Sequence, residues 1–66
     1  MNKVKGFRTM LGMTQEEMAE AIGISINTYR TWEDDPGKFK LEQAKKFTEV
    51  VNKVDPAITL ADIFSN

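Results

Sequence analysis

The sequence contains no cysteine and no histidine. Without cysteine there is no disulfide framework, no thiolate metal site and no thiol nucleophile. Without histidine the commonest general base and the commonest metal ligand are missing. The sequence also shows no nucleophile–base pair, no metal-binding cluster and no phosphate loop. We therefore expect the protein not to be an enzyme, and to have no catalytic residue, metal, cofactor or small-molecule substrate.

Long hydrophobic runs are missing as well. No apolar segment approaches the roughly 20 residues needed to cross a membrane, and the N-terminus lacks the core of a signal peptide. We therefore expect a cytoplasmic protein without a membrane partner. No linker, repeat or low-complexity segment is visible, so residues 1–66 are expected to form a single domain. A domain of this size lies near the lower limit for folding without disulfides or metals, which predicts marginal stability.

The chain also lacks a strong charge of one sign. Nine Lys and Arg against ten Asp and Glu give a net charge of −1, whereas nucleic-acid-binding domains usually carry a basic excess. The charges are segregated along the sequence, which permits a basic face with a modest contribution to phosphate binding. The basic groups are Lys3, Lys5 and Arg8, then Lys38 and Lys40; the acidic groups are Glu16, Glu17 and Glu20, then Glu33, Asp34 and Asp35.

The most informative segment starts at Thr14. Thr14 and Glu17 have the spacing of a capping box, so a helix should begin directly after Thr14. Gly23 can adopt the left-handed turn that ends such a helix, and Ser25 supplies a second N-cap only two residues later. Two short helices joined so tightly must turn sharply, which predicts a helix-turn-helix. The second helix of such a unit can enter the major groove of DNA.

The spacing within this segment carries a family resemblance. Counting from Gln15, Ala19 is fifth, Gly23 ninth, Tyr29 fifteenth and Trp32 eighteenth. This resembles the helix-turn-helix of the Cro and lambda-type phage repressors, also called the xenobiotic-response-element type. That family has Gln first, a small residue fifth, Gly ninth and apolar residues at the last two places.

The resemblance extends from about residue 4 to residue 64. It implies an all-α, compact five-helix bundle, a lambda-repressor-like DNA-binding domain with the helix-turn-helix at its second and third helices. It also implies sequence-specific binding of double-stranded DNA by a phage or prophage transcriptional regulator or repressor, with the third helix in the major groove.

Hydrophobic periodicity predicts five helices and no strand. The helices start at Lys3, at Gln15, just after Ser25, at Leu41 and at Leu60. The segment Asp34-Asp35-Pro36-Gly37 is expected to form a loop in which Gly37 can take a left-handed turn. The first should end near Leu11, the fourth near Lys53 and the last at Phe64. The predicted core is Val4, Phe7, Leu11, Met18, Ala19, Ile22, Tyr29, Trp32, Leu41, Ala44, Phe47, Val51, Leu60 and Ile63.

One face of the third helix is polar and the opposite face is apolar. The apolar half must be buried because so short a helix is not stable by propensity alone. Asn binds adenine and Arg binds guanine through two hydrogen bonds, and the methyl groups of Ile and Thr pack on the thymine methyl. The family resemblance points to the first residues of this helix and to those one turn further on. The predicted base contacts are therefore Ile26, Asn27, Thr28, Arg30 and Thr31.

Each of these assignments has a simpler alternative. Asn27 could be a solvent-facing polar residue, and Arg30 could pair with Asp34 four residues later. On the fourth helix, Lys45 and Lys46 are interpreted as a solvated face rather than as DNA contacts.

Contacts with the DNA backbone are expected from another set of residues. Gln15 lies at a helix N-terminus, which favours a phosphate, and in the family the matching Gln binds the backbone and braces the recognition helix. Thr14 and Ser25 can add hydroxyl contacts, or act only as N-caps. Lys38 and Lys40 follow the third helix, where such repressors also touch phosphate.

The loop after the third helix departs from the family pattern. Asp34 and Asp35 stand where members often carry Asn and Gly, and a carboxylate near phosphate is repulsive. Besides an enzyme, which the missing catalytic groups argue against, two functions therefore remain. The protein is either a DNA-binding regulator, or a protein-interaction module that keeps the fold but has lost DNA binding.

Arg8 and Glu33 each flank a buried stripe and would be costly to bury alone. We expect them to form an ion pair with forked hydrogen bonds that locks the first helix onto the third, or else to reach solvent separately. The resemblance implies the pair. It also implies a possible homodimer through the C-terminal region. Four apolar residues there either form the dimer contact or complete the core of a monomer: Val50, Val54, Ile58 and Phe64.

Overall fold

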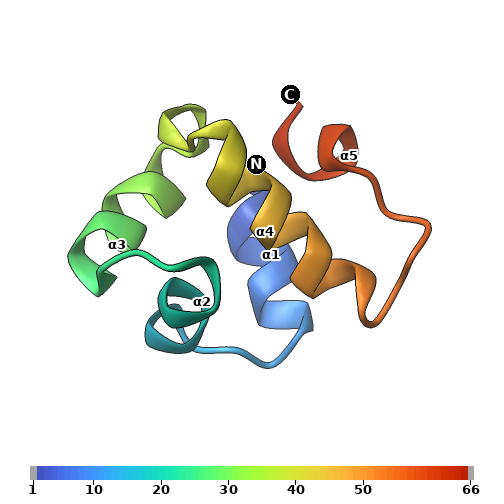
Figure 1. The fold of residues 1–66 in the computed structure, drawn as a ribbon, viewed down its shortest axis with the longest axis horizontal. Coiled ribbons are helices and arrows are strands. Elements are labelled where there is room, and N and C mark those ends of the chain that lie inside the picture. Colours follow the sequence, from blue (N-terminus) through green and yellow to red (C-terminus); the bar gives the residue numbers. More distant parts are fainter. Residues whose placement is uncertain (1, 66) are drawn as a thin grey trace.

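The computed structural model describes residues 2–65, and these form helices and connecting turns without a strand (Figure 1). The all-α prediction is confirmed. In chain order the elements are α1 (Lys3–Met10), α2 (Gln15–Ile22), α3 (Ile26–Asp34), the 3-10 turn η1 (Pro36–Lys38), α4 (Leu41–Asn52) and α5 (Leu60–Phe64).

Short polar side chains start most of these helices. Thr14 and Thr59 each form a full capping box, and the Ser25 hydroxyl accepts from the backbone N–H of Thr28. Asn2 caps α1 in the same way, since its side chain accepts from the backbone N–H of Lys5. Each cap satisfies a backbone donor that the first helical turn leaves free.

Two glycines end helices with a left-handed backbone. Gly12 follows α1 with φ 71° and Gly23 follows α2 with φ 76°, a conformation that costs other residues free energy. Gly37 does not adopt this conformation, which corrects our expectation. The chain turns there through η1, which begins at Pro36, because proline supplies the φ angle that a 3-10 turn needs.

The core lies where α1, α2 and α4 meet α3 and α5. Its buried members are the apolar residues Val4, Met18, Ala19, Ile22, Tyr29, Ala44, Phe47, Val51 and Ile63. Phe7, Leu11, Trp32 and Leu60 are half-buried rather than buried.

Leu41 was predicted in the core, and this is wrong, because 62% of it is exposed. Phe39 occupies this end of the core instead. Its ring centroid lies 5.4 Å from that of Trp32, 4.9 Å from that of Phe64 and 6.1 Å from that of Phe47. Such tilted and edge-on contacts suit aromatic rings. The sequence placed Phe39 in a connection, where periodicity gives no signal.

The C-terminal apolar residues mostly complete the core of this chain. Val50, Ile58 and Phe64 pack against it, whereas Val54 is 68% exposed. Asn52 secures the connection by donating to the carbonyl oxygen of Ile58 at 2.7 Å. Of the four residues considered for a dimer contact, only Val54 therefore offers a largely free apolar side chain.

Among residues 2–65, no helix is both long enough and apolar enough to cross a membrane.

Candidate nucleic-acid interface

Helices α2 and α3 form a tight helix-turn-helix. The backbone N–H of Ile24 donates to the carbonyl oxygen of Ala19 at 3.0 Å, so the chain reverses immediately after Gly23. Ala19 is 2% exposed, and Tyr29 of α3 is fully buried. This packing leaves α3 at one edge of the molecule (Figure 1).

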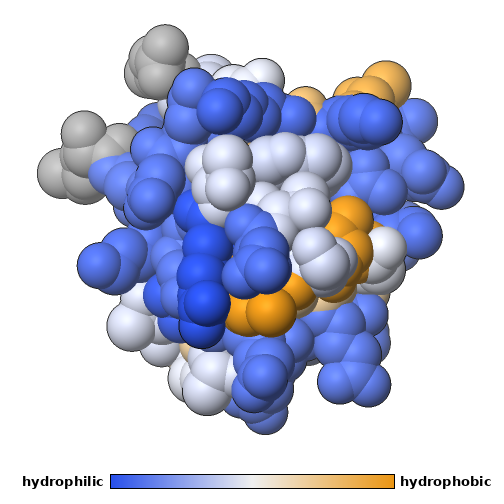
Figure 2. Space-filling view, turned by 90° about the vertical axis from the view of Figure 1, so that its left-hand side faces the viewer, coloured by the Kyte–Doolittle hydropathy of each residue, from blue (hydrophilic) through white to orange (hydrophobic). Residues whose placement is uncertain are grey.

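The outer face of α3 presents polar side chains. Asn27, Arg30 and Thr31 are exposed, while Tyr29 and Glu33 are buried on the inner face. Figure 2 views the side of the molecule that carries α3 and shows hydrophobic side chains gathered near the middle of a mainly hydrophilic face. Ile24, in the turn before α3, and Ile26, the first residue of α3, are half-buried and pack against the core.

The threonine hydroxyl groups on α3 already have partners. The Ser25 hydroxyl donates to Thr28 Oγ1 at 2.9 Å, and Thr28 is half-buried. The Thr31 hydroxyl donates to the carbonyl oxygen of Asn27 at 3.2 Å. Arg30 makes no ion pair within residues 2–65, so the expected alternative pairing with Asp34 is absent there. The side chains of Asn27 and Arg30 thus make no hydrogen bond to other described residues.

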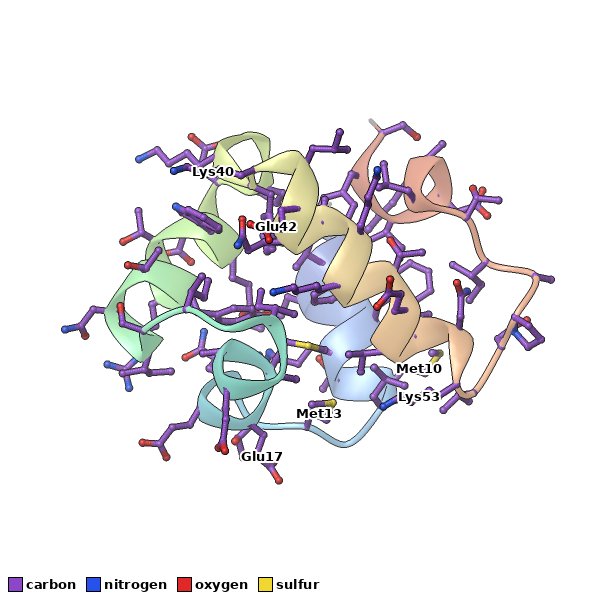
Figure 3. The ribbon with its side chains drawn as sticks, in the orientation of Figure 1. Met10, Met13, Glu17, Lys40, Glu42 and Lys53 are labelled. Carbon is purple, nitrogen blue, oxygen red and sulfur yellow. The ribbon has the colours of Figure 1, made fainter. Side chains whose placement is uncertain are left out.

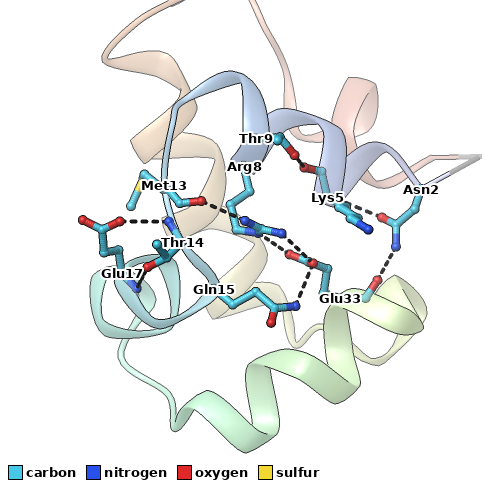
Figure 4. Close-up of polar contacts among 9 residues, drawn as sticks. All are labelled: Asn2, Lys5, Arg8, Thr9, Met13, Thr14, Gln15, Glu17 and Glu33. Atoms are coloured by element: carbon cyan, nitrogen blue, oxygen red, sulfur yellow. Dashed lines mark hydrogen bonds and ion pairs between the residues drawn. The ribbon is translucent and has the colours of Figure 1, made fainter.

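Behind α3, the structure brings Arg8 and Glu33 together (Figure 4). Arg8 Nε lies 2.7 Å from Glu33 Oε2, and Arg8 Nη2 donates to Glu33 Oε1 at 3.1 Å. Arg8 Nη1 also donates to the carbonyl oxygen of Met13 at 2.8 Å. The two side chains are 12% and 2% exposed, so the pair is shielded from water. One guanidinium therefore joins α1, the α1–α2 connection and α3.

Gln15 extends this network to α2. Its Nε2 donates to Glu33 Oε1 at 3.0 Å, and its side chain is half-buried. At the other end of Glu33, Asn2 Nδ2 donates to the backbone carbonyl oxygen, a contact that sequence reasoning missed. The first residue of α2 and the N-cap of α1 are thereby fixed to α3.

The ion pair is reflected in the titration of its members. Burial would raise the pKa of the Glu33 carboxyl, but hydrogen bonds from Arg8 and Gln15 outweigh it and hold that pKa below its ordinary value. The hydrogen bond to Glu33 raises the pKa of Arg8 in turn. Burial is also the main cause of the raised pKa of the Tyr29 hydroxyl nearby. Glu33 is therefore charged, and Tyr29 protonated, at neutral pH.

The residues expected at the DNA backbone surround α3. Thr14 accepts from the backbone N–H of Glu17, and Ser25 accepts from Thr28, so both are N-caps with exposed side chains. Lys38 and Lys40 are exposed, and Lys40 lies at the start of α4 (Figure 3). No side chain caps α4, so its first backbone N–H groups have no side-chain partner.

The acidic pair lies beside the chain ends. Asp34 and Asp35 are exposed and line a cleft of about 460 Å³, together with Lys3 and Phe64.

Lys45 and Lys46 are exposed on α4. The Lys46 ammonium lies 3.7 Å from the position that a Cβ on Gly23 would take, at the C-terminus of α2. A cation there is favoured by the helix dipole.

Comparison with known proteins supports this geometry. A family model described as helix-turn-helix matches residues 4–58, which is most of the chain. Searches among curated proteins and among solved structures each gave no match. The match covers the capped helix pair and the helices that pack behind it. The chain belongs to the Cro and lambda-repressor type of helix-turn-helix family.

Proposed function

We propose that the domain is a transcriptional regulator of the Cro or repressor kind, which binds specific double-stranded DNA with α3 in the major groove. The observation that carries this proposal is the outer face of α3. Asn27 and Arg30 are exposed there, and their side chains make no hydrogen bond to other described residues. Their amide and guanidinium groups match the major-groove edges of adenine and guanine.

Three neighbouring side chains of α3 complete the proposed base-reading surface around these two residues. Ile26, Thr28 and Thr31 supply methyl groups, which suit the 5-methyl group of thymine. Thr28 is half-buried, and its hydroxyl accepts a hydrogen bond from the Ser25 hydroxyl.

Phosphate contacts in this proposal come from two helix N-termini and two lysines. Gln15 Nε2 donates one of its two N–H groups to Glu33, and the second can donate to a phosphate oxygen. Thr14 and Ser25 lie at the N-termini of α2 and α3. Lys38 and Lys40 lie beside the uncapped N-terminus of α4, where the helix dipole favours an anion.

The acidic residues set the alternative. Asp34 and Asp35 are exposed next to α3, and the net charge is −1. Carboxylates near the DNA backbone reduce affinity. If they abolished it, the same fold would act as a protein-interaction module.

The test is a selection of bound sites from random double-stranded DNA, followed by titration of the best site at several salt concentrations. A regulator gives a recurrent sequence and an affinity that falls with salt, with a slope of about −0.9 for each phosphate contacted. Recovery of no sequence, with no salt-dependent mobility shift, would leave the interaction module as the function.

Lys38 and Lys45 provide a matched pair of exposed lysines for this titration. Lys38→Ala should reduce the salt slope by about 1 without changing sequence preference. Lys45→Ala, on α4, should leave the slope unchanged. Equal effects of the two substitutions would contradict the proposed position of the DNA backbone.

A further inference from the structure

The chemistry of the α3 surface is one-sided. Residues 26–32 carry an amide and a guanidinium but no carboxylate. In the major groove, cytosine presents an amino donor, which a carboxylate accepts best, whereas thymine presents a carbonyl acceptor and a 5-methyl group. Over residues 26–32 the surface therefore lacks the group best suited to cytosine and has apolar groups suited to thymine, while the exposed carboxylate of Asp34 lies at the other end of α3.

Ile26 is the fixed apolar group on this surface. It is the first residue of α3, directly after the Ser25 N-cap, at the helix end that recognition helices present to base edges. Ile26 is half-buried, and it packs against the core. Its β-branched side chain has little χ1 freedom in a helix. The part that remains exposed is thus held in place before any DNA arrives.

Thr31 adds a second apolar group one turn beyond Asn27. Its hydroxyl proton is donated to the carbonyl oxygen of Asn27. With that donor occupied, the groups left to face a base are the methyl and the acceptor lone pairs. The Thr31 oxygen can still accept from a base amino group, whereas Ile26 offers only apolar contacts.

We propose that Ile26 is a specificity-determining residue that selects thymine in the bound site by packing on its 5-methyl group. This inference rests on the proposed function, since it concerns the DNA that α3 reads. A buried methyl group contributes about a fourfold difference in affinity. Replacing the contacted thymine by uracil, which removes only the methyl, should therefore weaken binding about fourfold.

The test uses the site obtained by selection and the unmodified protein. At each thymine in turn, four bases are compared: thymine and uracil opposite adenine, and 5-methylcytosine and cytosine opposite guanine. Methyl readout predicts that thymine binds more tightly than uracil, and 5-methylcytosine more tightly than cytosine, by the same factor. Readout of the carbonyl oxygen predicts instead that thymine and uracil bind equally, and that result at every thymine would overturn the proposal.

Two isoleucines then assign the effect to a residue. Ile24 and Ile26 are both half-buried and both pack against the core, but Ile24 lies in the turn before α3. Ile26→Ala should bring the thymine-to-uracil affinity ratio close to 1, while Ile24→Ala should leave the ratio at the wild-type value. A wild-type ratio in Ile26→Ala would overturn the assignment.

The thymine-to-uracil affinity ratio, rather than the affinity itself, separates loss of core packing in the variant from loss of the contact with the thymine methyl. If Ile26→Ala does not fold by circular dichroism, Ile26→Val takes its place. A ratio below that of the wild type then supports the proposal and an unchanged ratio overturns it. Failure of the initial selection is a different result, because it removes DNA binding altogether and contradicts the proposed function.

Discussion

Replacing Arg8 by Met should strongly destabilise the domain. The substitution leaves the Glu33 carboxylate, which is 2% exposed, with the Gln15 amide at 3.0 Å as its remaining side-chain donor. Breaking a buried ion pair by removing one partner costs about 3–5 kcal/mol. A domain of 66 residues has a free energy of unfolding of roughly 3–10 kcal/mol. A loss of this size would unfold a domain at the lower end of that range and would leave one at the upper end folded with a much smaller free energy of unfolding.

The double variant Arg8→Met with Glu33→Leu should recover much of this loss, because it buries no unpaired charge. Urea titrations of the wild type, both single variants and the double variant give the free energy of unfolding and complete the cycle. A coupling of several kcal/mol is expected. Additive losses would mean that the two side chains do not stabilise each other, and the structural role of the pair would be refuted.

Acid provides an independent measurement of the same pair. The pKa of Glu33 is lowered in the folded state from an ordinary value of 4.5. Its contribution to stability is therefore present above about pH 4.5 and is lost as the pH falls through the folded-state pKa. The wild type should lose stability in this acid range, and the double variant should lose less.

Three further predictions concern the base contacts, the symmetry of the DNA site and two glycines. Asn27→Ala should cost about 1–3 kcal/mol on the preferred site and relax preference at one base pair, whereas Gln15→Ala should weaken all sequences evenly; unchanged site preference in Asn27→Ala would contradict the assignment. If the protein dimerises on DNA, the selected site should be a near-palindrome with half-site centres about 10–10.5 base pairs apart, and a single asymmetric site bound by a monomer would exclude this. Gly23→Ala should destabilise the domain by about 1–2 kcal/mol because Gly23 has φ 76°. Gly6→Ala, with no atom within 4 Å of the new methyl, should stabilise α1 by up to about 1 kcal/mol; thermal denaturation that shows the same direction for both would refute the backbone argument.

The interface combines a rigid support with a modest electrostatic attraction. Arg8, Glu33 and Gln15 tie three helices together behind the proposed recognition surface, so the angle of α3 is fixed within the domain. Asp34 and Asp35 oppose the phosphate contacts expected from Lys38 and Lys40. We therefore expect base contacts to carry a larger share of specific affinity here than in a strongly basic domain.

The sequence by itself determined the helices and the sharp turn between α2 and α3. Thr14, Gly23 and Ser25 act within a few residues of their own position, through caps and a left-handed turn, so their effect can be recognised without knowing the fold. Apolar periodicity likewise identified the buried faces of α2 and α4. The family resemblance followed from the same local spacing.

Only the tertiary structure decided which side chains fill the space between helices. Phe39 lies in a connection, where no periodicity marks it, yet it contacts the rings of Trp32 and Phe64 and fills the end of the core that was assigned to Leu41. The bond from Asn2 to the backbone of Glu33 spans 31 residues. Such contacts depend on how helices cross in three dimensions, and local hydrogen bonding and residue spacing do not specify those crossings.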